Sequence, residues 1–200
     1  MPRRSFLSFR LRPVAWVAAL ALTACDADNS PAPFATVDQV FAPGAADAVT
    51  GIGQVGAYAQ TFTAGRTGTL SSIDLILAAQ GSDDVIRIDV RSVVGGSPSL
   101  DDGVVLGSRQ FTASSFPATP SQAFVIIDFR GQGISCVAGQ SLAIVVTRVS
   151  GAGASAVLWI TENQATEDYV AGSGFQRTAG SGTGWTPLAN DFYFRTQLLD

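Results

Sequence analysis

The residue with the most clearly defined chemistry is Cys25, which ends the sequence Leu22-Thr23-Ala24-Cys25. This pattern has the form of a bacterial lipobox, in which the cysteine thiol is acylated and the chain is cut just before the cysteine. One acyl chain binds a membrane only marginally, whereas the about two or three chains expected on such a cysteine, palmitate among them, hold a protein firmly. The pattern therefore predicts a mature chain that begins at Cys25 and is anchored by lipid.

The residues before Cys25 have the layout of a secretory signal peptide, with arginines first and then an apolar run from Val14 to Leu22. This run is about half of the roughly 20 apolar residues that a membrane-spanning helix needs. Leu22, three residues before the cut, suits a lipobox better than the usual signal peptidase site, which prefers small residues there. We therefore expect an extracytoplasmic protein held at the cell membrane, on its periplasmic side or at the cell surface.

Arg3 and Arg4 are candidates for a specific export signal. The sequence Arg3-Arg4-Ser5-Phe6-Leu7 resembles the twin-arginine motif, although Ser8 stands where that motif often has lysine. Asp26, directly after the acylated position, resembles the signal that retains some Gram-negative lipoproteins in the inner membrane. The sequence leaves open both the export route and the membrane that holds the anchor.

The residue types that the chain lacks exclude several classes of enzyme. Its 200 residues include no histidine and no lysine. This excludes histidine-dependent nucleophilic sites, lysine Schiff bases, P-loop lysines and metal sites with imidazole ligands. Without residues 1–24 the chain has 8 arginines and 16 acidic residues, a net charge of about −8, so nucleic acid is a poor partner. With Cys25 acylated, Cys136 has no disulfide partner and is expected to be buried and structural.

Carboxylates are the remaining groups that could hold a metal or catalyse a reaction. Acidic pairs lie in expected turns at Asp83-Asp84, Asp101-Asp102 and Glu167-Asp168. Asp101 and Asp102 are the calcium candidates, but no pair has the spacing of an EF-hand loop, so we expect solvated turn residues. Glu162 and Asp191 could form the carboxylate pair of a glycosidase, although nothing in their spacing singles them out. The sequence therefore predicts no catalytic residues and no cofactor.

Aromatic side chains are the candidates for contact with sugar rings, because an exposed ring offers a flat apolar surface. Trp185 and Tyr169 lie in Gly-rich loops, where exposure is easier, and are the two candidate ligand-binding residues. A loop tryptophan also often fills the end of a β-sandwich, so that interpretation stays open for Trp185. Trp159 lies in an expected strand between Leu158 and Ile160, and we expect it to pack in the core.

The body of the chain alternates apolar and polar residues with a period of two, which is typical of strands with one buried face. The expected strands lie at residues 37–41, 58–62, 70–77, 85–93, 104–111, 123–129, 142–148, 156–161 and 192–198. The clearest of them, at 85–93, carries Arg87, Asp89 and Arg91 on one face, which we expect to be solvated. A polar stretch at 162–184 has no strand assigned to it.

No segment shows an amphipathic helical repeat of useful length. Short strands separated by turns rich in Gly, Pro, Asp and Ser predict an all-β fold, an antiparallel β-sandwich of jelly-roll type. An immunoglobulin-like Greek-key sandwich is the alternative, although the paired cysteines of antibody domains are absent. The expected organisation is a signal peptide at 1–24, the lipidated cysteine and a flexible linker at 25–35, and one sandwich domain at 36–200.

Four phrases of the body stand out when they are taken together. They are Gln60 to Gly65, Gly68 to Leu75, Gly139 to Val145, and Gly184-Trp185 with Asp191 to Thr196. This combination resembles the β-sandwich modules of bacterial exported proteins often labelled choice-of-anchor domains. The resemblance implies a jelly roll related in shape to carbohydrate-binding domains and attached to the cell by an anchor. Because its motifs consist of hydrophobic and turn residues, it implies a fold and gives no catalytic residues.

These observations predict a lipid-anchored, non-catalytic module of the cell envelope that binds glycan or another extracellular polymer. A structural or protein-contacting role in the envelope is the alternative, because the sequence shows no convergent polar site. A carboxylate glycosidase is the third hypothesis. The expected partners are the membrane, through the lipid, and a glycan or an envelope protein.

Overall fold

The computed structural model describes residues 34–42, 47–53, 56–80, 84–101, 104–119, 123–150, 155–162, 169–178 and 184–200. All of them lie in Pro33–Asp200, the second of the two units into which the chain divides. The predictions for the signal peptide with Arg3 and Arg4, for Cys25 and for Asp102 concern residues outside these ranges. Among the described residues, there is no helix with the length and apolar character that crossing a membrane requires.

The described part of the chain is built from β-strands, with a short 3-10 helix, η2, after the eighth strand. The elements are β1 (Ala35–Phe41), β2 (Asp47–Gly53), β3 (Gly56–Thr63), β4 (Gly68–Leu75), β5 (Leu77–Ala79), β6 (Val85–Val94), β7 (Ser97–Pro98), β8 (Val105–Thr112), η2 (Ala113–Ser115), β9 (Val125–Asp128), β10 (Ser135–Cys136), β11 (Ser141–Ser150), β12 (Ser155–Glu162), β13 (Gly174–Thr178), β14 (Thr186–Pro187) and β15 (Phe194–Leu199). The prediction of an all-β fold is confirmed.

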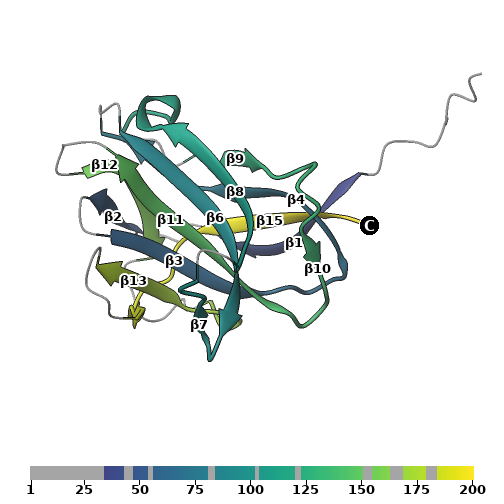
Figure 1. Ribbon diagram of the computed structural model, residues 1–200. Coiled ribbons are helices and arrows are strands. Elements are labelled where there is room, and N and C mark those ends of the chain that lie inside the picture. The colour runs from purple at the N-terminus through teal and green to yellow at the C-terminus, as the bar shows by residue number, and fades with distance from the viewer. Residues whose placement is uncertain are drawn as a thin grey trace, which may run out of the picture. The chain divides into compact units, whose positions relative to one another are not determined.

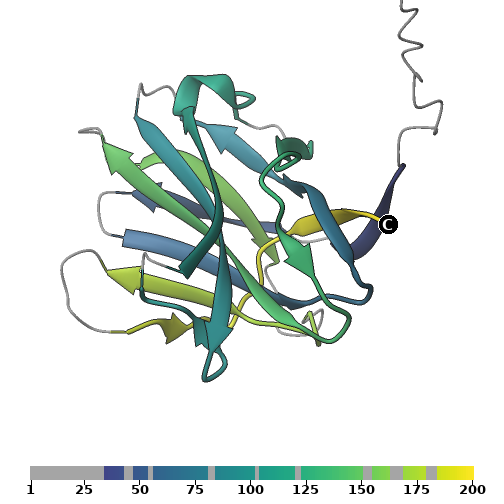
Figure 2. The ribbon, with the colours of Figure 1, turned by 45° about the vertical axis from the view of Figure 1, so that its right-hand side comes forward.

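The strands form an antiparallel sandwich of two main layers. One layer is a seven-stranded sheet in the order β14-β13-β3-β11-β6, with β7 and β8 both paired to β6. The other is a five-stranded sheet in the order β1-β15-β4, with β9 and β10 both paired to β4. Figures 1 and 2 show β6, β11 and β3 crossing in front of β4 and β15. The chain crosses repeatedly between the layers, for example from β3 to β4 and from β10 to β11, so several hydrogen-bonded neighbours, such as β3 and β11, are remote in sequence.

A third sheet, in the order β2-β12-β5, prolongs the five-stranded layer at one end. The expected strand at 70–77 is therefore two strands, because the chain changes partners at Ile76. Before this residue β4 pairs with β15 and β9, and after it β5 pairs with β12. The backbone carbonyl of Ile76 accepts a hydrogen bond from Ile160 N at 3.1 Å, and Ile160 O in turn accepts one from Tyr193 N at 3.1 Å.

The core between the layers is formed by the apolar half of each alternating strand. On β11, Leu142, Ile144 and Val146 are fully buried against side chains of the opposite layer, such as Ile73 and Phe194. Complete burial of one such aliphatic side chain contributes roughly 1.5–3 kcal/mol, so the inward faces of the central strands supply much of the stability. The strands therefore owe their register to the burial pattern as well as to their hydrogen bonds.

Two expectations about the strands are wrong. The charged face of β6 is not solvated, because Asp89 and Arg91 are both buried and only Arg87 keeps a substantial exposed fraction, 29% of its side chain. The polar stretch at 162–184 contains β13, which pairs with β3 and extends the seven-stranded sheet. Both differences concern the face of that sheet that points away from the core, which we call the outer face.

We predict that Ile144→Ala lowers the free energy of unfolding by about 2–5 kcal/mol, because it leaves a cavity at the centre of the core. The matched control on the same strand is Val149→Ala, where the wild-type side chain is 49% exposed and the expected change is within about 0.5 kcal/mol. Urea unfolding of both variants measures the difference. Equal losses would contradict the inward orientation of Ile144.

Candidate functional site

The outer face of the seven-stranded sheet brings two arginines into one cross-strand row. Arg87 of β6 pairs with Thr147 of β11, Thr147 pairs with Ala57 of β3, and Ala57 pairs with Arg177 of β13. Residues directly opposite one another share a face of a sheet, so all four side chains point outward. Two long cationic side chains thus flank two short side chains in this row.

The close pairing of β13 with β3 at this row depends on Gly56. Its φ of +146° lies in a region that other residues rarely adopt, and a Cβ atom there would overlap the carbonyl oxygen of Arg177. Gly56 pairs with Thr178, the residue that follows Arg177. This glycine therefore allows the contact that holds Arg177 over the sheet.

The next two rows of the outer face supply an apolar floor. Ala59, Ala143, Val145 and Phe175 form a small buried cluster, and the half-buried Trp185 packs against it. This cluster lies on the opposite side of the sheet from the main core. Small side chains on the central strands keep the floor low, so the larger residues around it enclose a hollow.

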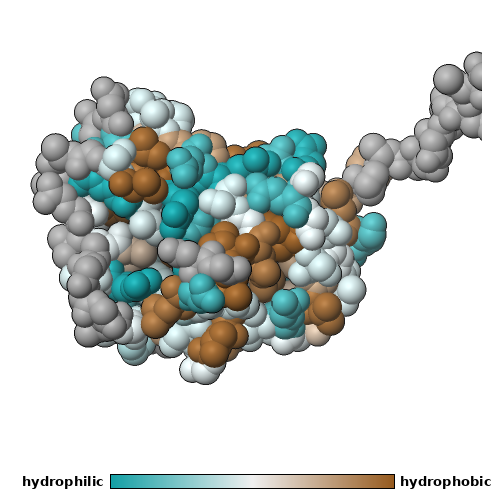
Figure 3. Space-filling view, in the orientation of Figure 1, coloured by the Kyte–Doolittle hydropathy of each residue, from teal (hydrophilic) through white to brown (hydrophobic). Residues whose placement is uncertain are grey.

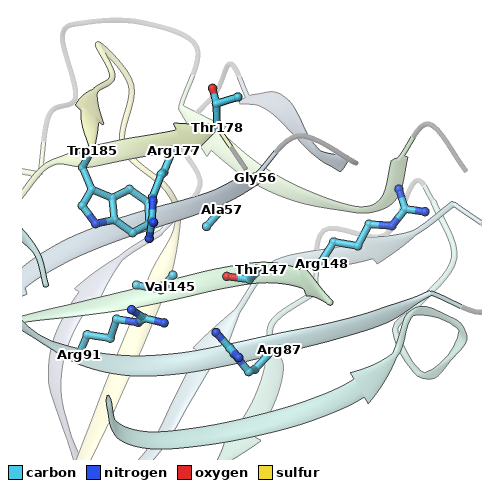
Figure 4. A pocket seen from close by; sticks show the side chains of 10 residues that line it. All are labelled: Gly56, Ala57, Arg87, Arg91, Val145, Thr147, Arg148, Arg177, Thr178 and Trp185. Atoms are coloured by element: carbon cyan, nitrogen blue, oxygen red, sulfur yellow. The ribbon is translucent and has the colours of Figure 1, made fainter. Parts of the chain in front are cut away.

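The hollow is a pocket of about 210 Å³. Figure 4 shows the guanidinium groups of Arg87, Arg91 and Arg177 turned toward the space above Val145, while the side chain of Arg148 extends away from it. The indole of Trp185 forms the wall beside Arg177. Figure 3 shows this side of the molecule as a mixture of hydrophobic and hydrophilic patches rather than one continuous apolar surface.

Asp89 positions two of these arginines. Its Oδ2 atom accepts hydrogen bonds from Arg91 Nη2 at 2.8 Å and from Arg87 Nε at 3.1 Å, and its Oδ1 atom accepts one from Ser108 Oγ at 2.8 Å. A buried carboxylate is stable only when it is paired in this way. Asp89 therefore orients guanidinium groups and is held below the surface of the pocket. Arg148 forms a separate buried pair with Asp84, at 2.9 Å.

Trp185 lies between two hollows. Besides the arginine-lined pocket, it borders a second hollow of about 490 Å³ whose wall includes Val94, Pro98 and Leu100. The indole nitrogen is buried and has no hydrogen-bond acceptor among the described residues. The position of the ring is therefore set by packing against Phe175 and its neighbours, and not by a polar contact.

The structure separates the two aromatic candidates. Tyr169 is buried, its ring packs against Phe41 and Phe194, and its hydroxyl donates to Gln39 Oε1 at 2.7 Å. Burial raises the pKa of Tyr169 to about 12, and the nearby charges of Asp38 and Asp191 act in the same direction. The residue borders a shallow hollow of about 380 Å³, but its ring belongs to the core. Of the two, Trp185 is the one whose ring lines the arginine pocket.

The expectations for Trp159 and Cys136 are confirmed, since both residues are completely buried. The indole of Trp159 packs against Phe192, and its nitrogen donates to the carbonyl of Tyr193 at 3.1 Å. Burial, with a smaller contribution from Asp38, raises the pKa of the Cys136 thiol to about 11. Such a thiol stays protonated at neutral pH and is a poor nucleophile.

The two carboxylates nominated for glycoside hydrolysis are both buried. Asp191 accepts hydrogen bonds from Gln60 Nε2 at 2.8 Å and from the backbone nitrogen of Tyr169 at 3.0 Å. The backbone nitrogen of Glu162 donates to the carbonyl of Asp191 at 3.2 Å, so the two residues are neighbours. These contacts give Asp191 a role in joining β3 to the segment around Tyr169.

Of the two calcium candidates, Asp101 lies in the described ranges. Asp101 is exposed near the second hollow. Within the described ranges, no group of three or more Asp, Glu or Cys side chains is arranged to hold a metal ion.

Comparisons with known proteins give no identification. No protein-family model matches the chain, and no curated protein has a significantly similar sequence. The resemblance to choice-of-anchor modules therefore stays a prediction.

The arginine pocket was missed at the level of sequence, although part of its signal was present. The alternation of Arg87, Asp89 and Arg91 predicts a solvated face and gives no sign that Asp89 gathers the two arginines at a pocket. Arg177 lies in a stretch to which no strand was assigned, so nothing placed it opposite Ala57. The pairing of β13, at residues 174–178, with β3 is what brings Arg177 to the pocket.

We predict that Asp191→Ala lowers the free energy of unfolding by about 2–4 kcal/mol, because two buried donors lose their acceptor. Asp200→Ala is the control, since its exposed pair with Arg66 is worth at most about 1 kcal/mol. Chemical denaturation of both variants gives the comparison. A fully stable Asp191→Ala variant would show that this carboxylate is not needed for folding and would reopen its catalytic interpretation.

Proposed function

We propose that this chain is a lipid-anchored, extracytoplasmic module that binds glycan on the outer face of its seven-stranded sheet and does not catalyse a reaction. The observation that carries the proposal is the position of Trp185, at the wall of a pocket with an apolar floor and guanidinium groups around it. Sugar rings combine an apolar face of C–H groups with a rim of hydroxyls. An aromatic wall and a few convergent hydrogen-bond donors suit that combination.

The chemistry of the lining favours binding over catalysis. Glycoside hydrolysis needs two carboxyl groups that flank the scissile bond. The described residues that line the pocket include four arginines and two threonines but no carboxylate. Arginine has five N–H donors and does not lose its charge at neutral pH, so it can hold hydroxyl or anionic groups but cannot act as a general acid or base there.

The lipid anchor would place this face near other envelope components. Residues 26–34 separate Cys25 from the first residue of β1, Ala35. A chain of this length spans at most about 30 Å when fully extended. The sandwich would thus stay close to the membrane surface, within reach of polymers of the envelope.

A protein-contacting role is the second candidate. Val94 and Leu100 are exposed beside Trp185 in the second hollow, and exposed apolar residues of this kind often contact another protein. We rank it second because the arginine pocket has a polar character that a purely apolar contact does not need.

For the binding site, we predict that Trp185→Ala weakens glycan binding at least about tenfold, since loss of one buried aromatic contact costs roughly 1.4 kcal/mol or more. The assay is calorimetry or affinity electrophoresis with a panel of polysaccharides, on residues 25–200 with Cys25→Ser to keep the chain in solution. Val137→Ala, an exposed residue next to β10 on the other layer, is the control. Equal binding by Trp185→Ala and the parent would remove the indole from the site, and silence across the panel would favour the protein-contacting role.

For the anchor, we predict that cells producing the full chain incorporate labelled palmitate into it and retain it in the membrane fraction. Cys25→Ser is expected to abolish both, because the thiol is the acylated atom. Trp185→Ala is the matched control and should be labelled normally. A Cys25→Ser chain that is still labelled would overturn the assignment of the anchor.

A further inference from the structure

The arginine pocket stands out against the charge of the molecule. After Cys25 the chain has 8 arginines and 16 acidic residues, yet 4 of these arginines line a single pocket of about 210 Å³. Three of them, Arg87, Arg91 and Arg177, turn their guanidinium groups toward its interior (Figure 4). The described lining holds no acidic residue. Asp89 pairs with Arg87 and Arg91, and Asp84 pairs with Arg148, so two carboxylates outside the lining offset part of this charge. The positive charge that remains is more than a neutral sugar needs.

Arg177 is the arginine most available to a ligand. It is half-buried at the wall of the pocket, and among the described residues no carboxylate forms an ion pair with it. Arg91, by contrast, is almost completely buried and is held by Asp89 and by the carbonyl of Ser99, at 3.3 Å. Arg87 is also held by Asp89, at 3.1 Å, but 29% of its side chain is exposed. Arg91 thus serves as part of the wall, whereas Arg177 and the exposed part of Arg87 face a bound molecule.

The spacing of Arg87 and Arg177 suits an anionic group held between them. They occupy the same cross-strand row three strands apart, so their Cα atoms are separated by about 14 Å at the usual strand spacing. Thr147 and Ala57, which lie between them, are short and leave the space open. The hydroxyl of Thr147 adds one more hydrogen-bonding group to the floor.

Trp185 lies on the same side of the pocket as Arg177. Phe175 and Gln176 of β13 pair with Pro187 and Thr186 of β14, so the next position along places Arg177 opposite Trp185. A sugar ring against the indole would therefore carry its substituents toward the guanidinium of Arg177. Guanidinium groups match the geometry of carboxylate and sulfate with paired, charge-assisted hydrogen bonds.

We propose that the ligand is an acidic polysaccharide, with a sugar ring on Trp185 and its carboxylate or sulfate group between Arg87 and Arg177. This inference rests on the proposed glycan-binding function and specifies its ligand class. The net negative charge of the domain opposes a polyanion at long range, but charges farther apart than about 8 Å are largely screened at physiological salt. Selectivity is therefore set by contact in the pocket.

The test compares each polymer with a form that differs only in its charge. Alginate is measured beside carboxyl-reduced alginate, and dextran sulfate beside dextran, at about 0.15 M salt, with residues 25–200 carrying Cys25→Ser. The variants are Arg177→Gln and Arg87→Gln. The control is Arg66→Gln, which removes the same charge from an exposed site between β3 and β4. Thermal unfolding verifies that each variant is folded.

We expect at least about tenfold tighter binding to the charged member of one pair. Arg177→Gln and Arg87→Gln should each lose roughly ten- to a hundredfold in affinity for that polymer, the size of a lost charge-assisted hydrogen bond, and less than about twofold for its neutral form. Arg66→Gln should change neither value. The pair that shows the effect identifies the group as carboxylate or sulfate.

The outcomes separate this inference from the proposed function. Equal affinity for charged and neutral forms, with Trp185→Ala still defective, would overturn the acidic ligand and leave glycan binding in place. Loss of binding in Arg66→Gln equal to that in Arg177→Gln would overturn it too, since the effect would come from net charge alone. Absence of binding to all four polymers and to the wider panel would overturn the proposed function and this inference together.

Discussion

The pairing of β11 with β3 and β6 is the interaction on which the rest of the structure depends. It aligns Ile144 with Val90 and Gln60 toward the core, and it aligns Thr147 with Arg87 and Ala57 on the outer face. Because side chains alternate with a period of two, a slip of one residue would exchange the two faces. Burial of the aliphatic face therefore fixes the register, and the register in turn assembles the pocket from strands that are remote in sequence.

Buried charges organise the outer surfaces of both layers in a similar way. Asp89 gathers Arg87 and Arg91 on the seven-stranded sheet. On the five-stranded sheet, Asp74 is completely buried and accepts hydrogen bonds from Arg195 Nε at 2.7 Å and Gln197 Nε2 at 2.9 Å. Such buried pairs are weak contributors to stability, because desolvation of the charges offsets their attraction. Their clearer effect is geometric, since each holds long side chains in one orientation over the sheet.

The strands could be predicted from the sequence more fully than the site. Alternation of apolar and polar residues marks β6, β11 and β15 because each has one face in the core. The alternation fails for β13. Gly174 is buried and lies close to the carbonyl oxygen of Asn190, whereas Gln176 and Thr178 are exposed, so the strand carries little apolar signal. The pocket depends on β13 to supply Arg177. The pocket could not be derived from the local sequence pattern alone, since strand order in a sandwich is set by packing among distant segments.

Tyr169 and Trp185 both lie in Gly-rich loops, but their rings occupy different environments. After Tyr169 the chain is tied to β3, because Thr61 N donates to Ser173 O at 2.9 Å and Ser173 N donates to Thr61 Oγ1 at 2.9 Å. A side-chain carbon at Gly172 would overlap the carbonyl oxygen of Thr61, so glycine is needed for this close approach. That contact draws the tyrosine ring into the core. Trp185 precedes β14, at the edge of the seven-stranded sheet, and its ring lies over the small residues of the outer face instead. A glycine near an aromatic residue thus accompanies a close backbone contact in the Tyr169 loop and an open surface in the Trp185 loop. The strand that each loop contacts determines which of the two environments the aromatic ring has.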